Sequence, residues 1–214
     1  MGTQRQPVAG RSQPPSPRFV VLEGLDGAGT TTQAGLVADA LRARGAVVCL
    51  TAEPTDGPLG RVLRSHVRGE ISLGPHTAAL TFTADRADHL ERTIRPALSR
   101  GEWVVSDRYL LSTIAYQGAE GADRDWILEA SRGFEVPDLT VYLAVPAPEL
   151  AGRLSRRERT DRYEAPDLDV RLRAAYEESI AMLRSRGHLI EVVDGAREPR
   201  DVLDDVLARL DALG

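Results

Sequence analysis

The sequence contains no lysine, and all 27 of its basic residues are arginines. Set against 32 acidic residues, they leave a formal net charge of -5 on the 214-residue chain. A protein whose main task is to grip nucleic acid needs a broad basic surface, so this balance argues against a nucleic-acid partner. Long apolar runs are also missing. None approaches the ~20 residues that a helix needs to cross a bilayer, and we expect no membrane partner.

Cysteine is almost absent as well. The single Cys49 cannot form an internal disulfide, which favours the reducing cytoplasm. It lies in the apolar stretch 47–50, so we interpret it as a small core residue and not as a reactive thiol. Residues 1–17 lack acidic and nearly all apolar side chains but hold four prolines, a composition that predicts a disordered tail.

From Arg18 onward, short apolar runs alternate with helical patterns. This alternation implies an α/β fold with three layers, in which a mainly parallel sheet of five strands is covered by helices on both faces. We expect one domain over residues 18–214. The expected strands are 19–22, 47–51, 103–105, 139–145 and 188–193, and the expected helices are 32–44, 75–100 (one helix or a pair), one from 148, 167–186 and 199–213.

The turn between the first strand and the first helix carries a phosphate-binding motif. Residues 24–31 read GLDGAGTT and match G-x-x-x-x-G-K-[ST] at both glycines and at the final threonine. Glycines let the backbone wrap around a phosphate with its N–H groups inward, and the helix start adds its positive end. Thr31 stands where its hydroxyl can bind Mg²⁺. A plain glycine-rich turn is the alternative, but the position between a buried strand and a helix favours a phosphate site.

The lysine of the motif is replaced by Thr30. The loop amides and the helix dipole remain, so nucleotide binding can survive. A charge-assisted contact to the β- and γ-phosphates, worth ~1.5–3 kcal/mol, is lost. Because the chain contains no lysine at any position, an active enzyme needs an arginine to supply this charge.

Five segments of the chain resemble bacterial thymidylate kinase, in the same order and at similar spacing. The resemblance extends over residues 18–214. It implies a P-loop nucleoside monophosphate kinase that transfers a phosphoryl group from ATP to dTMP with Mg²⁺, usually as a homodimer with a helix such as 77–98 in the interface. The segments are FVVLEGLDGAGTTTQ (19–33), AEPTDGPLG (52–60), FTADR (82–86), DRYLLSTIAYQG (107–118) and DRYE (161–164).

The resemblance also implies roles for individual residues. Phe82 and Arg86 are four apart, hence on one helix face, where the ring stacks on a pyrimidine and the guanidinium reaches a base carbonyl. From the residues alone, a core Phe82 and a surface Arg86 would be the preferred interpretation. The donor is expected at Gly24, Leu25, Asp26, Gly27, Ala28, Gly29, Thr30, Thr31 and Thr32, the metal at Thr31 and Asp107, and the acceptor at Glu53, Pro54, Phe82, Arg86, Arg108, Thr113, Tyr116 and Gln117.

Four residues are implied to be catalytic. Asp26 lies near the 3′-hydroxyl and phosphate of the acceptor, and the forked donors of Arg108 suit its monophosphate. The other two, Arg153 and Arg157, belong to a segment with five arginines between residues 153 and 162. By itself this run suggests a solvated helix face. It aligns with the arginine-rich lid of the family, and we hypothesise that a lid arginine replaces the missing lysine.

Some features stay open or receive no role. A kinase for another nucleoside monophosphate, or a nucleotide-binding homologue without catalysis, remains an alternative. Ala52, in place of an arginine common in the family, favours the second. Asp194-Gly195 is expected, by the resemblance, beside the donor base. The histidines 66, 76, 89 and 188 lack metal-ligand or triad spacing and are assigned no role.

Overall fold

A computed structural model of the protein describes residues 18–154 and 166–213. A five-stranded sheet with the order β2-β3-β1-β4-β5 forms its centre, and each pair of neighbouring strands is parallel. The predicted fold class is therefore confirmed. The strands are β1 (Phe19–Gly24), β2 (Val48–Ala52), β3 (Trp103–Asp107), β4 (Leu139–Ala144) and β5 (Ile190–Asp194).

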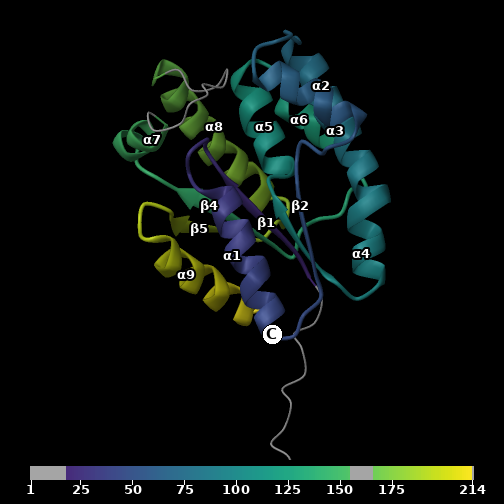
Figure 1. Cartoon of the computed structure of the whole chain (residues 1–214). Helices are drawn as coiled ribbons and strands as arrows, with labels where there is room; N and C mark the ends of the chain where they lie inside the picture. Colours follow the sequence, from purple (N-terminus) through teal and green to yellow (C-terminus); the bar gives the residue numbers. More distant parts are fainter. Residues whose placement is uncertain (1–17, 155–165, 214) are drawn as a thin grey trace, which may run out of the picture.

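Helices cover both faces of the sheet. In Figure 1, α1 and α9 lie in front of the sheet, whereas α4, α5 and α8 lie behind or beside it. The helices are α1 (Thr30–Ala43), α2 (Pro58–Val67), α3 (Pro75–His89), α4 (Arg95–Ser99), α5 (Leu110–Ala119), α6 (Arg124–Ala130), α7 (Ala147–Leu154), α8 (Pro166–Arg184) and α9 (Pro199–Asp211), with a π-helical turn, η1 (Leu90–Ile94), between α3 and α4.

The core is built on the central strand. All six residues of β1 are buried, as expected for a parallel strand covered on both faces. Cys49, predicted as a small core residue, is half-buried at the margin of this core and packs against it, and burial raises the pKa of its thiol. No helix among the described residues is long and apolar enough to cross a membrane.

Three helices were not predicted. The helix α2 begins at Pro58, directly after Gly57, a favourable start because proline fits the first helical position. The helices α5 and α6 follow β3, where the sequence argument saw only a motif. The expected helix 75–100 is a continuous run of α3, η1 and α4, and the first helix starts at Thr30 instead of Thr32.

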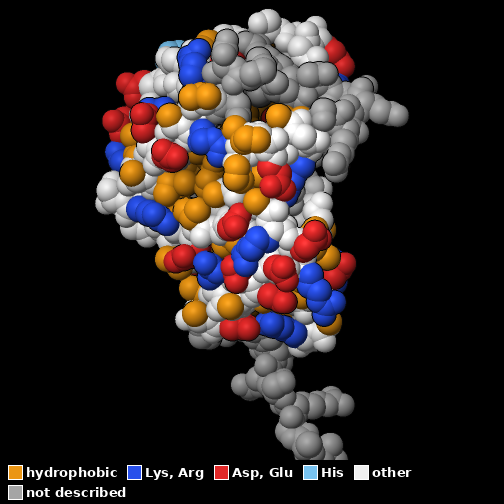
Figure 2. Space-filling model, turned by 90° about the vertical axis from the view of Figure 1, so that its left-hand side faces the viewer, with side chains coloured by type: hydrophobic (Ala, Val, Ile, Leu, Met, Phe, Trp, Pro, Cys, Tyr) orange, Lys and Arg blue, Asp and Glu red, His pale blue; other side chains and the backbone are white. Residues whose placement is uncertain are grey.

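Charged side chains of both signs alternate over the lower part of the face drawn in Figure 2, and hydrophobic side chains gather above them. Among the described residues of this face, charge of one sign does not accumulate over a large area. This arrangement agrees with the near-balanced composition of the chain.

Parallel strands end at the same edge of the sheet, which brings distant segments together. In the register of the sheet, Asp107 at the end of β3 lies beside Leu22 of β1 and Ala52 of β2. The loop after β1, the segment after β2 and the segment after β3 therefore share one edge. Ligand sites of open α/β sheets form at this carboxyl edge.

Candidate functional site

The loop between β1 and α1 has the backbone of a phosphate site. Gly27 and Gly29 have φ of 85° and 94°, in the left-handed region that favours glycine. The helix α1 begins at Thr30, so the amides of its first turn have no carbonyl partner inside the helix and point toward the loop. The residues predicted to bind the donor, 24–32, run from the end of β1 through this first turn.

Thr30, which replaces the lysine of the motif, is buried inside the loop with 6% of its surface exposed. A Cβ added to Gly24 would lie 2.9 Å from Ala28 Cβ and 3.3 Å from Thr30 Cγ2, so the three residues are closely packed. The threonine side chain thus takes part in packing the loop and brings no charge to it.

Thr31 and Asp107, the two predicted metal ligands, are in contact. The Thr31 hydroxyl donates a hydrogen bond to Asp107 Oδ2, across a separation of 76 residues in sequence. The other carboxylate oxygen, Asp107 Oδ1, is buried and has no hydrogen-bond partner among the described residues. A hydroxyl and a carboxylate with a vacant buried oxygen form a donor set that suits Mg²⁺, which prefers few protein oxygens and completes its shell with phosphate and water.

Arg153, at the end of α7, is brought to the phosphate loop. Its Nη1 lies 3.5 Å from Gly27 O and 3.4 Å from Ala28 O, and its Nη2 lies 3.0 Å from Gly195 O. Glu149, one turn earlier in α7, accepts a hydrogen bond from Nη2 at 2.8 Å. Arg153 and Gly195 line a cleft together with Gly27, Ala28, Gly29, Thr32 and Gln33. The other expected catalytic lid arginine, Arg157, falls outside the described residues.

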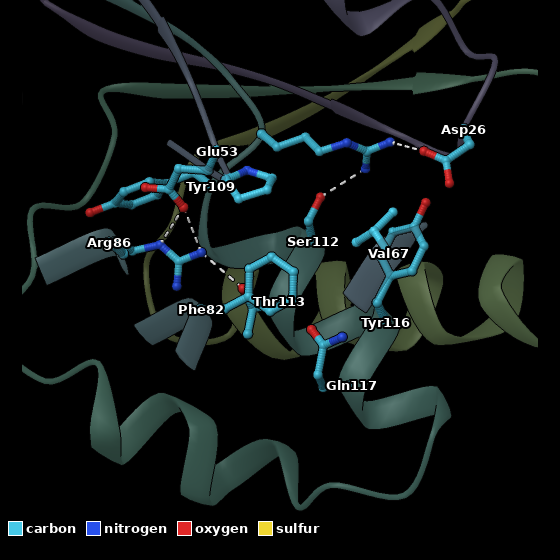
Figure 3. A pocket seen from close by; sticks show the side chains of 12 residues that line it. Asp26, Glu53, Val67, Phe82, Arg86, Tyr109, Ser112, Thr113, Tyr116 and Gln117 are labelled. Atoms are coloured by element: carbon cyan, nitrogen blue, oxygen red, sulfur yellow. Dashed lines mark hydrogen bonds and ion pairs between the residues drawn. The ribbon is translucent and has the colours of Figure 1, made fainter. Parts of the chain in front are cut away.

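A second pocket adjoins the loop on the other side, toward α3 and α5. Figure 3 shows the aromatic ring of Phe82 and the side chains of Arg86 and Gln117 directed into one space, with Asp26 at its far end. The eight predicted acceptor-site residues and Asp26 all line this pocket. Three further residues, Val67, Tyr109 and Ser112, line it but were not predicted as site residues. The whole set is Asp26, Glu53, Pro54, Val67, Phe82, Arg86, Arg108, Tyr109, Ser112, Thr113, Tyr116 and Gln117.

Arg86 is held by a buried ion pair at the base of the pocket. Its guanidinium donates to Glu53 Oε2 at 2.9 Å and to Thr113 Oγ1 at 2.8 Å, and both charged side chains are at most 3% exposed. The Tyr109 ring lies 4.9 Å from the guanidinium carbon, a cation–π contact. The remaining nitrogen, Nη1, is buried without a hydrogen-bond partner among the described residues. Arg86, only 1% exposed, therefore keeps one unused pair of donors at the pocket.

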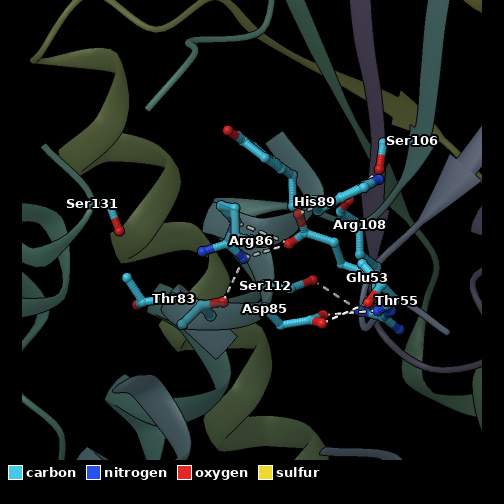
Figure 4. A network of polar contacts seen from close by, with 12 residues as sticks. Glu53, Thr55, Thr83, Asp85, Arg86, His89, Ser106, Arg108, Ser112 and Ser131 are labelled. Atoms are coloured by element: carbon cyan, nitrogen blue, oxygen red, sulfur yellow. Dashed lines mark hydrogen bonds and ion pairs between the residues drawn. The ribbon is translucent and has the colours of Figure 1, made fainter. Parts of the chain in front are cut away.

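Glu53 is fixed from its other side by a histidine. The His89 ring lies 3.0 Å from Glu53 Oε1 through Nδ1, and 2.6 Å from the Thr51 hydroxyl through Nε2. Figure 4 shows His89, Glu53 and Arg86 as one chain of polar contacts. No role was predicted for His89 from the sequence. Its spacing carried no signal, because its partners come from β2 and the segment after it, far away in sequence.

Arg108 lies at the boundary between the pocket and the phosphate loop. Its Nη2 donates to Asp26 Oδ1 at 2.5 Å, so two of the residues expected to be catalytic are in direct contact. Its guanidinium carbon also lies 5.5 Å from the centre of the Tyr116 ring. At this boundary the Arg108 guanidinium can donate to the phosphate of a molecule in the pocket and also to a phosphate bound by the loop.

Glu23 and Ser112 hold the segment after β3, which carries Arg108, in place. Neither was predicted as a site residue from the sequence. Glu23, fully buried at the end of β1, accepts hydrogen bonds from Tyr109 N at 2.9 Å and Ser112 N at 3.2 Å, and from the Ser112 hydroxyl at 2.5 Å. Burial raises the pKa of Glu23 from 4.5 to about 7, against the opposing effects of these hydrogen bonds and of Arg108. An acidic residue inside an otherwise apolar strand was the available signal.

A phosphate loop that opens onto a pocket for a second small molecule, at the carboxyl edge of a parallel sheet, is the arrangement of P-loop nucleoside monophosphate kinases, and this chain is of that class. Residues 22–206 match the family model for thymidylate kinase. The chain belongs to the thymidylate kinase family.

Individual relatives agree with this assignment. The chain is 42% identical to a thymidylate kinase of Bordetella petrii over 202 residues, covering 92% of this chain and 96% of that protein. It is 37% identical to a probable thymidylate kinase of Caldivirga maquilingensis, covering 90% and 93%. The solved structure of thymidylate kinase from Candida albicans shares the fold with a TM-score of 0.78, at 24% identity and 92% coverage of both chains.

Proposed function

We propose that the protein transfers a phosphoryl group from ATP to dTMP and releases ADP and dTDP. The observation that carries the choice of acceptor is the unpaired Nη1 of Arg86, buried beside Phe82 at the base of the pocket. A pyrimidine that stacks on the ring can offer a carbonyl oxygen to these donors. A buried donor is costly while it stays unpaired, so this site favours a base that satisfies it.

In this proposal the protein supplies alignment and charge and forms no covalent intermediate. The amides of the loop around Gly27 and Gly29 bind the phosphates of ATP. Arg108, held by Asp26, binds the monophosphate of the acceptor, and Tyr116 lies against its sugar. Thr31 and Asp107 would hold Mg²⁺, which would supply positive charge to the phosphates of the donor.

We further propose that Arg153 supplies the charge that the loop lacks at Thr30. The contacts of its guanidinium with Gly27 O and Ala28 O support this role, because they hold a cation at the rim of the loop before a nucleotide binds. Glu149 and Gly195 O hold Nη2, whereas the partners of Nη1 are neutral carbonyls at 3.4 and 3.5 Å, so a phosphate competes well for Nη1. Arg157 stays a candidate for the same role.

The decisive experiment is an ADP-release assay with ATP, Mg²⁺ and dTMP on the full chain. We expect turnover at or above ~1 s⁻¹, the lower range of ordinary enzymes. A panel of dTMP, dUMP, dCMP and dGMP tests the acceptor, and dTMP should have the highest kcat/KM. If dGMP, the purine of the panel, is used as well as dTMP, the proposed role of Arg86 is wrong.

A set of variants in the same assay tests the source of the missing charge. Arg153→Ala and Arg157→Ala should each be compared with Thr30→Lys, and at least one arginine variant should lose more than about tenfold in kcat. Thr30→Lys in the background of the harmful variant should restore part of the loss. If neither arginine matters, compensation by the lid is refuted.

A homologue that binds nucleotides without catalysis is the second candidate, since Thr30 and Ala52 remove two cations that the family commonly has. Calorimetry separates the two candidates. Affinity for ATP and dTMP without any ADP release would support the non-catalytic alternative. Absence of affinity for any nucleotide would refute both.

We also propose a cytoplasmic homodimer. Support for a partner surface comes from Leu59 and Val62 of α2 and Leu80 of α3, which are large apolar side chains exposed by 37%, 42% and 50%. Sedimentation should give twice the mass of 23.3 kDa. Leu80→Glu should shift the protein toward the monomer. If the variant stays a dimer, the interface does not include Leu80.

A further inference from the structure

The backbone and side chain of Arg108 are held in an unusual way. Among the residues that the structure describes, Arg108 is the only non-glycine residue in the left-handed region, with φ of 71°. Its Nη1 faces three acceptors, namely Gly24 O at 2.8 Å, Ser112 Oγ at 3.0 Å and Tyr176 OH at 3.2 Å. The backbone at this position is strained. These three contacts of Nη1, together with the ion pair of Nη2 with Asp26, fix the direction of the guanidinium.

Tyr176 is the one of these three contacts that comes from the C-terminal part of the chain. It belongs to α8, is fully buried, and lies 68 residues beyond Arg108 in sequence. Its ring is fixed by two aromatic neighbours, with centroid distances of 5.8 Å to Tyr116 and 4.9 Å to Tyr142. The position of its hydroxyl is therefore set by packing, which is the condition for orienting another group.

The hydroxyl of Tyr176 connects the phosphate loop with the pocket. It donates to Gly24 O at 3.1 Å, which leaves its oxygen lone pairs for the N–H groups of Arg108. It also lies 2.9 Å from Ser112 Oγ, whose hydroxyl donates to Glu23. Tyr176 itself is absent from the residues that line the pocket. Its effect on a bound molecule must therefore pass through a lining residue that it contacts, and of these (Arg108, Ser112 and Tyr116) only Arg108 carries a charge.

We propose that Tyr176 is a positioning residue, whose hydroxyl directs the Arg108 guanidinium toward the phosphate of the acceptor. The inference rests on the proposed function, because it takes Arg108 as the group that binds this phosphate. Arg86 and Arg108 are the cations that line the pocket, and Arg86 is engaged by Glu53. The orientation of the Arg108 guanidinium therefore matters for binding a phosphate.

The test compares a ligand that carries the phosphate with one that lacks it. Dissociation constants for dTMP and for thymidine are measured by calorimetry on the full-length wild type and on Tyr176→Phe, which removes only the hydroxyl. We expect the affinity for dTMP to fall by about fivefold or more and the affinity for thymidine to stay within about twofold. Tyr142→Phe, a buried tyrosine beside the same ring, is the matched control and should change neither value.

A double-mutant cycle identifies the route of the effect. Arg108→Ala should weaken dTMP binding, and Tyr176→Phe should add nothing further in that background. In kinetics, Tyr176→Phe should raise the KM for dTMP and leave the KM for ATP unchanged. Equal losses for thymidine and dTMP, an unchanged affinity for dTMP, or a Tyr176→Phe protein that melts far below Tyr142→Phe would each overturn the inference in favour of a structural role.

The proposed function fails in a different way. If the wild type binds no dTMP, or Arg108→Ala binds it as tightly as the wild type, Arg108 does not serve the acceptor phosphate and the inference falls with that function. If the wild type turns over dTMP and Arg108→Ala is impaired while Tyr176→Phe behaves as the wild type, only the inference is refuted.

Discussion

The buried Glu23 makes the stability of the protein depend on pH. Its carboxyl is fully buried, and its pKa rises from the ordinary 4.5 to about 7 in the folded protein, chiefly through burial. The folded state therefore holds the proton more tightly than the unfolded state. The stabilising contribution is complete below pH 4.5 and is lost as the pH rises through about 7.

The size of this contribution follows from the two pKa values. At about 1.4 kcal/mol per pH unit, a rise from 4.5 to about 7 corresponds to about 3 kcal/mol. Glu23→Gln has the shape of the protonated carboxyl but cannot ionise. Its amide oxygen can still accept the N–H groups of Tyr109 and Ser112, so the variant should fold and should lack this pH dependence.

The assay is urea unfolding of the wild type and Glu23→Gln at several values between pH 5 and 8. We expect the stability difference between variant and wild type to move in favour of the variant by about 2–3 kcal/mol as the pH rises over this range. Glu177→Gln, at an exposed position of α8, should follow the wild type. Parallel curves for the wild type and Glu23→Gln would refute the argument that burial raises this pKa.

Two further predictions concern packing around the pocket. Arg86→Ala leaves the Glu53 carboxylate buried without its arginine partner. Urea unfolding should show that the free energy of unfolding falls by about 3–5 kcal/mol. A fall below about 1 kcal/mol would contradict the buried ion pair. Gly60→Ala would place a Cβ 1.8 Å from Thr55 O, so the segment must shift at a cost of about 1–3 kcal/mol. Gly35→Ala, a helical site with open space, should instead be neutral or stabilising, and equal effects at both glycines would refute the steric reason.

Local patterns were sufficient for the fold and for the phosphate loop. A buried parallel strand is continuously apolar, and a helix has its own periodicity, so the order of the main elements is readable along the chain. The loop was predictable because its glycines, its amides and the start of α1 are neighbours in sequence. The shared face of Phe82 and Arg86 was also predictable, since it needs only the spacing of one helix.

The short helices between the strands were missed for a physical reason. The helices α2, α5 and α6 have 10, 10 and 7 residues. At these lengths a helix is stabilised by its packing more than by its own sequence, so the local pattern is weak. The residue types of segment 110–118 indicate a binding function, whereas the helix α5 on which they lie has only a weak local pattern.

The sequence alone determined that a parallel α/β sheet carries a phosphate loop with threonine in place of lysine. The packing of distant elements fixes which side chains support that loop. Glu23, Ser112 and Tyr176 meet Arg108 because β1, α5 and α8 pack together, and Arg153 reaches the loop because α7 ends above it. Apart from Arg108 with Ser112, which are four positions apart, these contacts join residues 64 to 152 positions apart, such as Ser112 with Tyr176 and Gly24 with Tyr176, and no local pattern encodes a partner at that separation.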